Sequence, residues 1–262
     1  MSKAQNYSAG SGAGTGGIAN THVGTAAGRV STGSSNCFVG YYAGSRNTGG
    51  RFNSFLGTDA GYWNTSGQYN SFLGYRAGNS NATGSYNCFI GAEAGHNNTT
   101  GTSNSFVGAQ AGFYNASGIA NSFFGTNAGY FNFGGSYNSF LGYQAGQENR
   151  TGTHNLFAGA SAGHRNSGGS RNSFLGSQAG IANYNGNDNT FVGYLAGAAN
   201  AGNDNTFLGS SAGKVNNIGI GNTFVGTSAG ASNTDGTANV FVGQLAGRGN
   251  TVGWGNTLLG QV

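Results

Sequence analysis

Hydrophobic and polar residues alternate along this chain with a fixed period that matches neither a helix nor a long strand. A phenylalanine and then an aliphatic residue follow a polar pair, and the full unit reads N-x-F-x-G-x-x-A-G-x-x-N-x-x-G-x-x. Fourteen units fill residues 20–255, each 17 residues long except two of 16. A short fixed period is typical of stacked-repeat proteins, in which each repeat contacts only its neighbours.

The small and amide residues that recur from unit to unit indicate short strands joined by tight turns. Glycines at unit positions 5, 9 and 15 predict positive φ angles. Asparagines at positions 1 and 12 are expected to tolerate left-handed geometry and to stack their amides from coil to coil. The glycine spacing leaves no run long enough for a helix. We therefore predict an all-β fold, a parallel β-solenoid (β-roll or β-helix) of about 15 coils with a 17-residue repeat.

The same pattern divides the chain into three parts. Residues 1–19 are predicted to form an N-terminal tail and a shortened, degenerate first coil, in which Ser8 replaces the phenylalanine. Residues 20–255 form the fourteen-coil solenoid, and residues 256–262 an incomplete C-terminal coil.

Residues at one unit position lie above one another in a solenoid, so position 3 predicts an internal aromatic ladder. His22 holds this place in the first full coil, which we attribute to a more hydrated end of the stack. The thirteen phenylalanines of the ladder are Phe38, Phe55, Phe72, Phe89, Phe106, Phe123, Phe140, Phe157, Phe174, Phe191, Phe207, Phe224 and Phe241.

Position 4 is expected on the opposite side, because neighbouring residues of a strand point to opposite faces. A continuous exposed apolar row is larger than a monomer usually leaves in water, and it indicates an interface. The alternative is a bend in the strand that buries both columns. The predicted interface row comprises Val39, Leu56, Leu73, Ile90, Val107, Phe124, Leu141, Leu175, Val192, Leu208, Val225, Val242 and Leu259.

Charge and reactive side chains are scarce. The 262 residues include 54 glycines, no proline, ten basic and six acidic side chains, four histidines and two cysteines. The net charge of +4 is spread along the chain, which argues against nucleic-acid binding. Cys37 and Cys88 share position 2 three coils apart, about 14 Å, which is too far for a disulfide. Asp188 and Asp204 share a column with Arg171 and predict a surface charge ladder.

No spacing of these residues matches a serine–histidine–aspartate triad or a metal site. We expect no catalytic residue, no metal, no cofactor and no enzymatic activity. Aromatic pairs at positions 10 and 11, near a turn, are suited to stacking on sugars or to contacts between subunits. These pairs are Tyr62–Trp63, Phe113–Tyr114 and Tyr130–Phe131.

The N-S-F-L-G-x-x-A-G units resemble the N-S-x-A-I-G repeats in the heads of trimeric autotransporter adhesins. They are more similar to the N-T-x-x-G-x-x-A repeats of bacterial surface and phage tail-fibre proteins. The resemblance covers residues 20–260 and implies a parallel β-roll with a structural or adhesive role outside the cell, on its surface or on a virion. No apolar run is long enough to cross a membrane, and no cleavable signal peptide is visible.

Two functions remain open. The first is a non-enzymatic structural subunit that assembles with itself into an extracellular or surface fibre. Assembly would be lateral along the position 4 row, or end to end because the terminal coils lack polar caps. The alternative is a trimeric adhesin or tail-fibre head that binds cell-surface glycans. Ice binding by the Ser/Thr column at position 2 is a third hypothesis, weakened by the other residues of that column, Leu156, Val240 and the two cysteines.

Overall fold

The predicted fold class is confirmed in a computed structural model that describes residues 5–261. The described chain contains sixteen strands of three residues each and no helix. It forms a parallel β-solenoid with one strand in each coil of about 17 residues. The coils fall into two compact units, divided between Gly134 and Gly135, and each is described by itself. Residues 1–4 of the predicted tail and Val262 lie outside the described residues.

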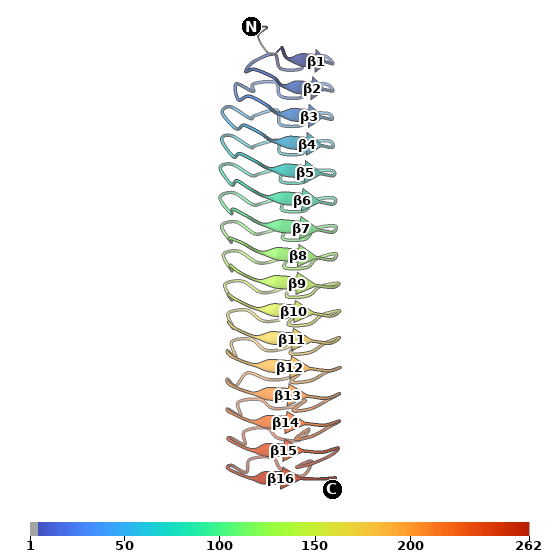
Figure 1. The fold of residues 1–262 in the computed structure, drawn as a ribbon, viewed down its shortest axis with the longest axis vertical. Coiled ribbons are helices and arrows are strands. Elements are labelled where there is room, and N and C mark those ends of the chain that lie inside the picture. The colour runs from blue at the N-terminus through green and yellow to red at the C-terminus, as the bar shows by residue number, and fades with distance from the viewer. Residues whose placement is uncertain (1–4, 262) are drawn as a thin grey trace. The chain divides into compact units, whose positions relative to one another are not determined.

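Each unit contains eight strands, stacked in chain order (Figure 1). The strands of the first unit are β1 (Tyr7–Ala9), β2 (Thr21–Val23), β3 (Cys37–Val39), β4 (Ser54–Leu56), β5 (Ser71–Leu73), β6 (Cys88–Ile90), β7 (Ser105–Val107) and β8 (Ser122–Phe124). Those of the second are β9 (Ser139–Leu141), β10 (Leu156–Ala158), β11 (Ser173–Leu175), β12 (Thr190–Val192), β13 (Thr206–Leu208), β14 (Thr223–Val225), β15 (Val240–Val242) and β16 (Thr257–Leu259).

Within each unit every strand pairs in parallel with the next coil, and equal unit positions face each other. Phe55 of β4, for example, pairs with Phe72 of β5. The polar–Phe–aliphatic tripeptide suits a strand because aromatic and branched residues favour the pleated conformation. The glycine at position 5 then ends the strand with a positive φ, 139° at Gly57, that a residue with a side chain rarely adopts.

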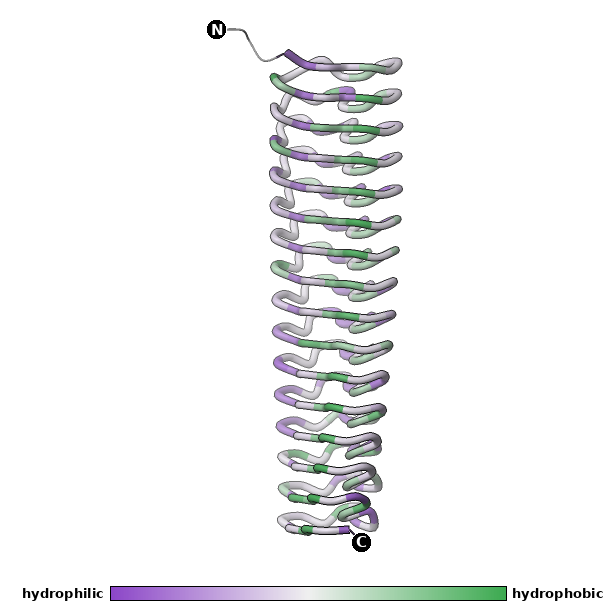
Figure 2. Tube along the Cα trace, turned by 45° about the vertical axis from the view of Figure 1, so that its right-hand side comes forward, coloured by the Kyte–Doolittle hydropathy of each residue, from purple (hydrophilic) through white to green (hydrophobic). Residues whose placement is uncertain are grey.

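The phenylalanines at position 3 form the core of both units. They are at most 1% exposed. Successive rings are nearly parallel with centroids 4.7–4.8 Å apart in the first unit, an offset-stacked arrangement. The ring leaves room only for glycine at position 9, since a Cβ on Gly78 would lie 2.4 Å from Phe72. Figure 2 shows the hydrophobic stretch at the same place in successive coils of each unit.

The two asparagine columns are buried beside the rings and hold successive coils together. At position 12 the Nδ2 of Asn81 donates to the Oδ1 of Asn64 at 2.7 Å and to the carbonyl oxygen of Gly84 at 2.8 Å. At position 1 the backbone N–H of Asn70 donates to the Oδ1 of Asn53 at 2.9 Å. Since these amides replace water as partners, burial of so many polar groups is compatible with stability.

Three local predictions were wrong. Asparagines at positions 1 and 12 do not adopt left-handed geometry, and their buried side chains form the ladders instead. Residues of positions 7 and 17, such as Asp59 and Tyr69, have positive φ instead. The glycine at position 15 is needed for space rather than for φ, since a Cβ on Gly84 would lie 2.4 Å from a carbonyl oxygen. His22 is fully buried, and its Nδ1 lies 2.7 Å from the carbonyl oxygen of Gly14.

Candidate functional site

The outer face of the strands presents the residues of positions 2 and 4. Position 3 points inward in the strands from β2 to β15, as in β4 and β5, so its two neighbours point outward. In the first unit Leu56, Leu73 and Ile90 are 49, 45 and 38% exposed. In the second, Leu141, Leu175 and Leu208 are also exposed, while Val192, Val225 and Val242 are half-buried. The position 4 row therefore lies at the surface of both units.

An apolar groove follows this face across β3 to β6. It has a volume of about 420 Å³, and its exposed lining atoms are apolar. One side is the position 2 row, which includes Cys37 and Cys88, and the other is the position 4 row. Both cysteines are free thiols. The groove and the aliphatic row beside it together define the outer β face.

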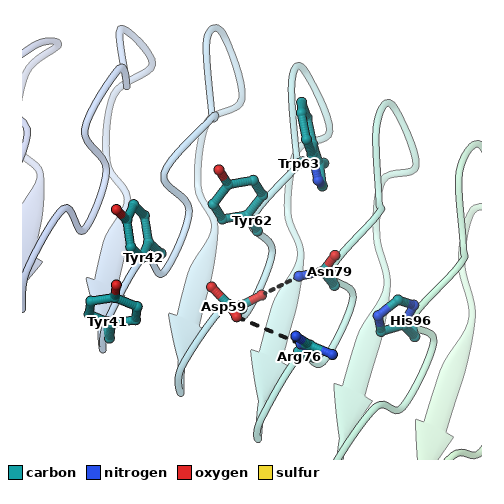
Figure 3. A pocket seen from close by; sticks show the side chains of 8 residues that line it. All are labelled: Tyr41, Tyr42, Asp59, Tyr62, Trp63, Arg76, Asn79 and His96. Carbon is teal, nitrogen blue, oxygen red and sulfur yellow. Dashed lines mark hydrogen bonds and ion pairs between the residues drawn. The ribbon is translucent and has the colours of Figure 1, made fainter.

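A second hollow, the aromatic cleft, lies on the turns of the first unit. It has a volume of about 490 Å³. Four successive coils, those of β3 to β6, contribute its side chains, which follow one another from coil to coil in Figure 3. The lining residues are Tyr41, Tyr42, Asp59, Tyr62, Trp63, Arg76, Asn79 and His96.

The aromatic rings of the cleft pack edge to face. The rings of Tyr41 and Tyr42 are perpendicular with centroids 4.4 Å apart, and those of Tyr62 and Trp63 are 5.2 Å apart at 73°. The side-chain hydrogen bond between Tyr41 and Tyr42 raises the pKa of Tyr41 above its usual range. The guanidinium carbon of Arg46 lies 4.2 Å from the centre of the Trp63 ring, a cation–π contact.

Charged and polar side chains also line the cleft. Arg76 Nε lies 3.7 Å from Asp59 Oδ2, and the amide of Asn79 donates to the backbone oxygen of Asp59 at 3.1 Å (Figure 3). His96 ends the row. Burial lowers the pKa of its imidazole below the usual range, which outweighs the opposite effects of Asn97 and Glu93. The cleft thus combines rings, one carboxylate, one guanidinium and a neutral imidazole.

Only two of the six aromatic residues singled out in the sequence reach this cleft, Tyr62 and Trp63. The other four pack on one another further along the first unit. Phe113 stacks on Tyr130 with centroids 5.1 Å apart, and Tyr114 stacks on Phe131 at 5.5 Å. All four are half-buried.

Sequence reasoning missed the remaining cleft residues because it treated each column separately. The turn brings the residue at position 10 back to the residue at position 7 of the same coil. The backbone N–H of Tyr62 donates to the backbone carbonyl oxygen of Asp59 at 3.3 Å. The signal was the adjacent pair Tyr41–Tyr42 at positions 6 and 7, one coil before Tyr62 and Trp63.

The charge column at position 17 is an exposed ion pair. Arg171 donates to both carboxylate oxygens of Asp188, at 2.6 and 2.7 Å. This hydrogen bonding lowers the pKa of Asp188 below its usual range. Among residues 5–261, no three histidine, cysteine or acidic side chains gather as metal ligands do. The described part of the chain also has no helix long and apolar enough to span a bilayer.

Comparison of the chain with protein-family models, with curated proteins and with solved structures found no match.

Proposed function

We propose that the chain is a non-enzymatic structural subunit that associates laterally with further copies of itself, as part of a fibre outside the cell or on a virion. The observation that carries the proposal is the exposed aliphatic row of the outer β face, represented by Leu56, Leu73 and Ile90. Contiguous apolar surface of this kind is typical of protein interfaces. The resemblance of the units to bacterial surface and tail-fibre repeats supports the location.

A second copy of the chain is the occupant that best fits this face. The groove and the aliphatic row both follow the direction in which coils stack, and both repeat at the strand spacing of about 4.8 Å. If the apolar side chains of a partner repeated at a different spacing, they would be in register with one coil and out of register with the next. A second copy has the same period, so its aliphatic row can enter the groove at each of the four coils from β3 to β6.

The size of the face is adequate for such an interface. Each strand presents an outward area of roughly 4.8 Å by about 10 Å. The eight strands of one unit offer on the order of 400 Å², about half of what each partner of a stable interface buries, so both units would have to contribute. Part of one unit alone falls short of this area, so we expect lateral association to involve many coils.

Sedimentation velocity over a range of concentrations tests the proposal. Wild-type protein is expected to shift to larger species as concentration rises. The triple variant Leu56→Thr, Leu73→Thr, Ile90→Thr should weaken this shift, because threonine keeps strand propensity but removes apolar area. Electron microscopy of the same samples distinguishes side-by-side pairs and bundles from end-to-end filaments.

A matched control changes exposed residues of the same three coils outside the outer β face. It is the triple variant Ser66→Ala, Thr83→Ala, Thr100→Ala, all at position 14. We expect it to associate like the wild type. Wild-type protein that stays monomeric at its highest soluble concentration, or equal loss of association in both triple variants, would contradict the proposal.

A further inference from the structure

The aromatic cleft of the first unit is lined by other residues than the outer β face that we propose for lateral association. The groove of the outer β face is lined by strand residues, whereas the cleft is lined by turn residues of positions 6, 7, 10 and 11. Two successive coils each contribute a pair of aromatic residues there, Tyr41–Tyr42 and Tyr62–Trp63. A ligand could therefore occupy the cleft while the outer β face is covered.

Trp63 offers a flat apolar platform. Its side chain is 44% exposed. Arg46, from the preceding coil, covers one face of the indole at 4.2 Å. Ser80 holds the same unit position in the following coil, and its short side chain cannot cover the other face. The faces of aromatic rings carry partial negative charge, which attracts the C–H groups on the apolar side of a sugar ring.

Asp59 and Arg76 supply hydrogen-bonding capacity beside this platform. Their 3.7 Å separation is longer than a hydrogen bond, so neither group has exhausted its capacity on the other. The carboxylate accepts only and the guanidinium donates only. A hydroxyl group does both, so neighbouring hydroxyls of a sugar can donate to Asp59 and accept from Arg76.

The charges of the cleft favour a neutral ligand. The carboxylate of Asp59 repels an anion and the guanidinium of Arg76 repels a cation. The guanidinium of Arg46 is held against the Trp63 ring. His96 adds no charge at neutral pH, because burial lowers the pKa of its imidazole. An uncharged molecule with one apolar face and several hydroxyls meets all of these conditions.

The dimensions favour a ligand longer than one sugar ring. The lining residues come from four successive coils, which span about 14 Å at the strand spacing. The volume of about 490 Å³ lies within the range of about 300–1,000 Å³ that is usual for ligand sites.

We propose that the aromatic cleft binds a neutral oligosaccharide, with Trp63 as the stacking platform and with Asp59 and Arg76 as the groups that bind its hydroxyls (Figure 3). Binding is non-covalent and leaves the glycan unchanged. The subunit would thereby attach a fibre to a glycan-bearing surface.

The test is a printed array of neutral hexose and N-acetylhexosamine oligosaccharides that also carries their sialylated and sulfated forms, probed with the full chain. We expect retention on neutral glycans. The best glycan is then titrated by calorimetry against variants. Trp63→Ala is expected to weaken binding about tenfold or more, the size of effect that loss of a stacked ring produces. Asp59→Asn removes the negative charge but keeps the shape of the side chain, and it should also weaken binding.

Two variants control for indirect effects. Trp254→Ala removes the other tryptophan, which lies in the second unit, and Phe133→Ala removes an exposed ring of the first unit outside the cleft. Both should bind like the wild type. The proposal is overturned if the wild type retains no neutral glycan, if Trp63→Ala and Asp59→Asn both bind unchanged, or if acidic glycans bind best and Asp59→Asn strengthens them.

Discussion

The buried amide ladder makes a sharp prediction at Asn216, in the second unit. The Nδ2 of Asn216 donates to the Oδ1 of Asn200 at 2.7 Å and to the carbonyl oxygen of Gly219 at 2.9 Å. Its Oδ1 accepts from the Nδ2 of Asn233 at 2.6 Å. The substitution Asn216→Asp keeps the shape of the side chain but puts an oxygen in place of the donating NH₂ group. That oxygen would then face two acceptors.

The magnitude follows from these contacts. Both acceptors keep a second donor, the Nδ2 of Asn205, at 3.2 and 2.9 Å. The variant still loses two buried hydrogen bonds of about 0.5–1.5 kcal/mol each, so the free energy of unfolding should fall by at least about 1–3 kcal/mol at pH 7. Burial should raise the pKa of the new carboxyl above its ordinary value of about 3.9, and the protonated form donates one hydrogen bond. Because the folded pKa is raised, this stabilising protonation is complete below about pH 3.9 and is lost as pH rises through the folded pKa.

Chemical denaturation of the wild type and the variant at about pH 3.5 and at pH 7 measures both effects. The difference between the two proteins should be larger at pH 7. Asn217→Asp is the matched control, since Asn217 is the next residue and is exposed. It should change stability little at either pH. If Asn216→Asp costs no more than Asn217→Asp at pH 7, or if its cost is the same at both pH values, the amide ladder does not hold the coils together as we argue.

Three further outcomes follow from the core. Phe72→Ala removes a fully buried, stacked ring and should lower the free energy of unfolding in urea by about 3–5 kcal/mol, and a loss below about 1 kcal/mol would contradict a packed ladder. Gly84→Ala puts a Cβ 2.4 Å from a carbonyl oxygen and should lower Tm. Gly49→Ala, whose Cβ meets its nearest neighbour at 3.9 Å, should not, and equal Tm values would refute the steric argument. Burial lowers the pKa of His22. When the pH is lowered below the ordinary histidine pKa of about 6.5, the unfolded chain takes up a proton that the folded chain does not, so the free energy of unfolding decreases as the pH is lowered. His22→Phe should reduce the fall in Tm between about pH 7.5 and about pH 5, and an unchanged fall would exclude this origin.

The period of the sequence was sufficient to predict the fold class because residues at one unit position have the same surroundings in every coil, so the same residue type recurs many times. Phe55 and Leu56 are adjacent, and the alternation of a strand places the first inside and the second outside. The structure of the turns could not be predicted in this way. Asparagine both tolerates left-handed geometry and forms amide ladders, and only the structure shows that Asn64 is used for the second purpose.

The aromatic cleft was hidden for a related reason. It depends on how position 10 folds back on position 7, which brings Tyr62 beside Asp59. A repeat period contains no information on such a turn. The cleft also requires positive φ angles at Asp59 and Arg76. These residues are not glycines, so the repeat pattern did not indicate left-handed geometry there.

The amide ladders also bear on how the length of such a protein changes during evolution. Each asparagine pairs with the same residue of the neighbouring coil, so deleting residues 70–86 would bring Asn87 opposite Asn53 with the same donors and acceptors. The coil 189–204 has 16 residues, yet the N–H of Asn205 still donates to the Oδ1 of Asn189 at 3.0 Å. Recombination between repeats can therefore lengthen or shorten the protein by whole coils without loss of hydrogen bonds. Insertions or deletions of several residues that are not a whole coil would misalign the asparagine columns, and selection would remove them.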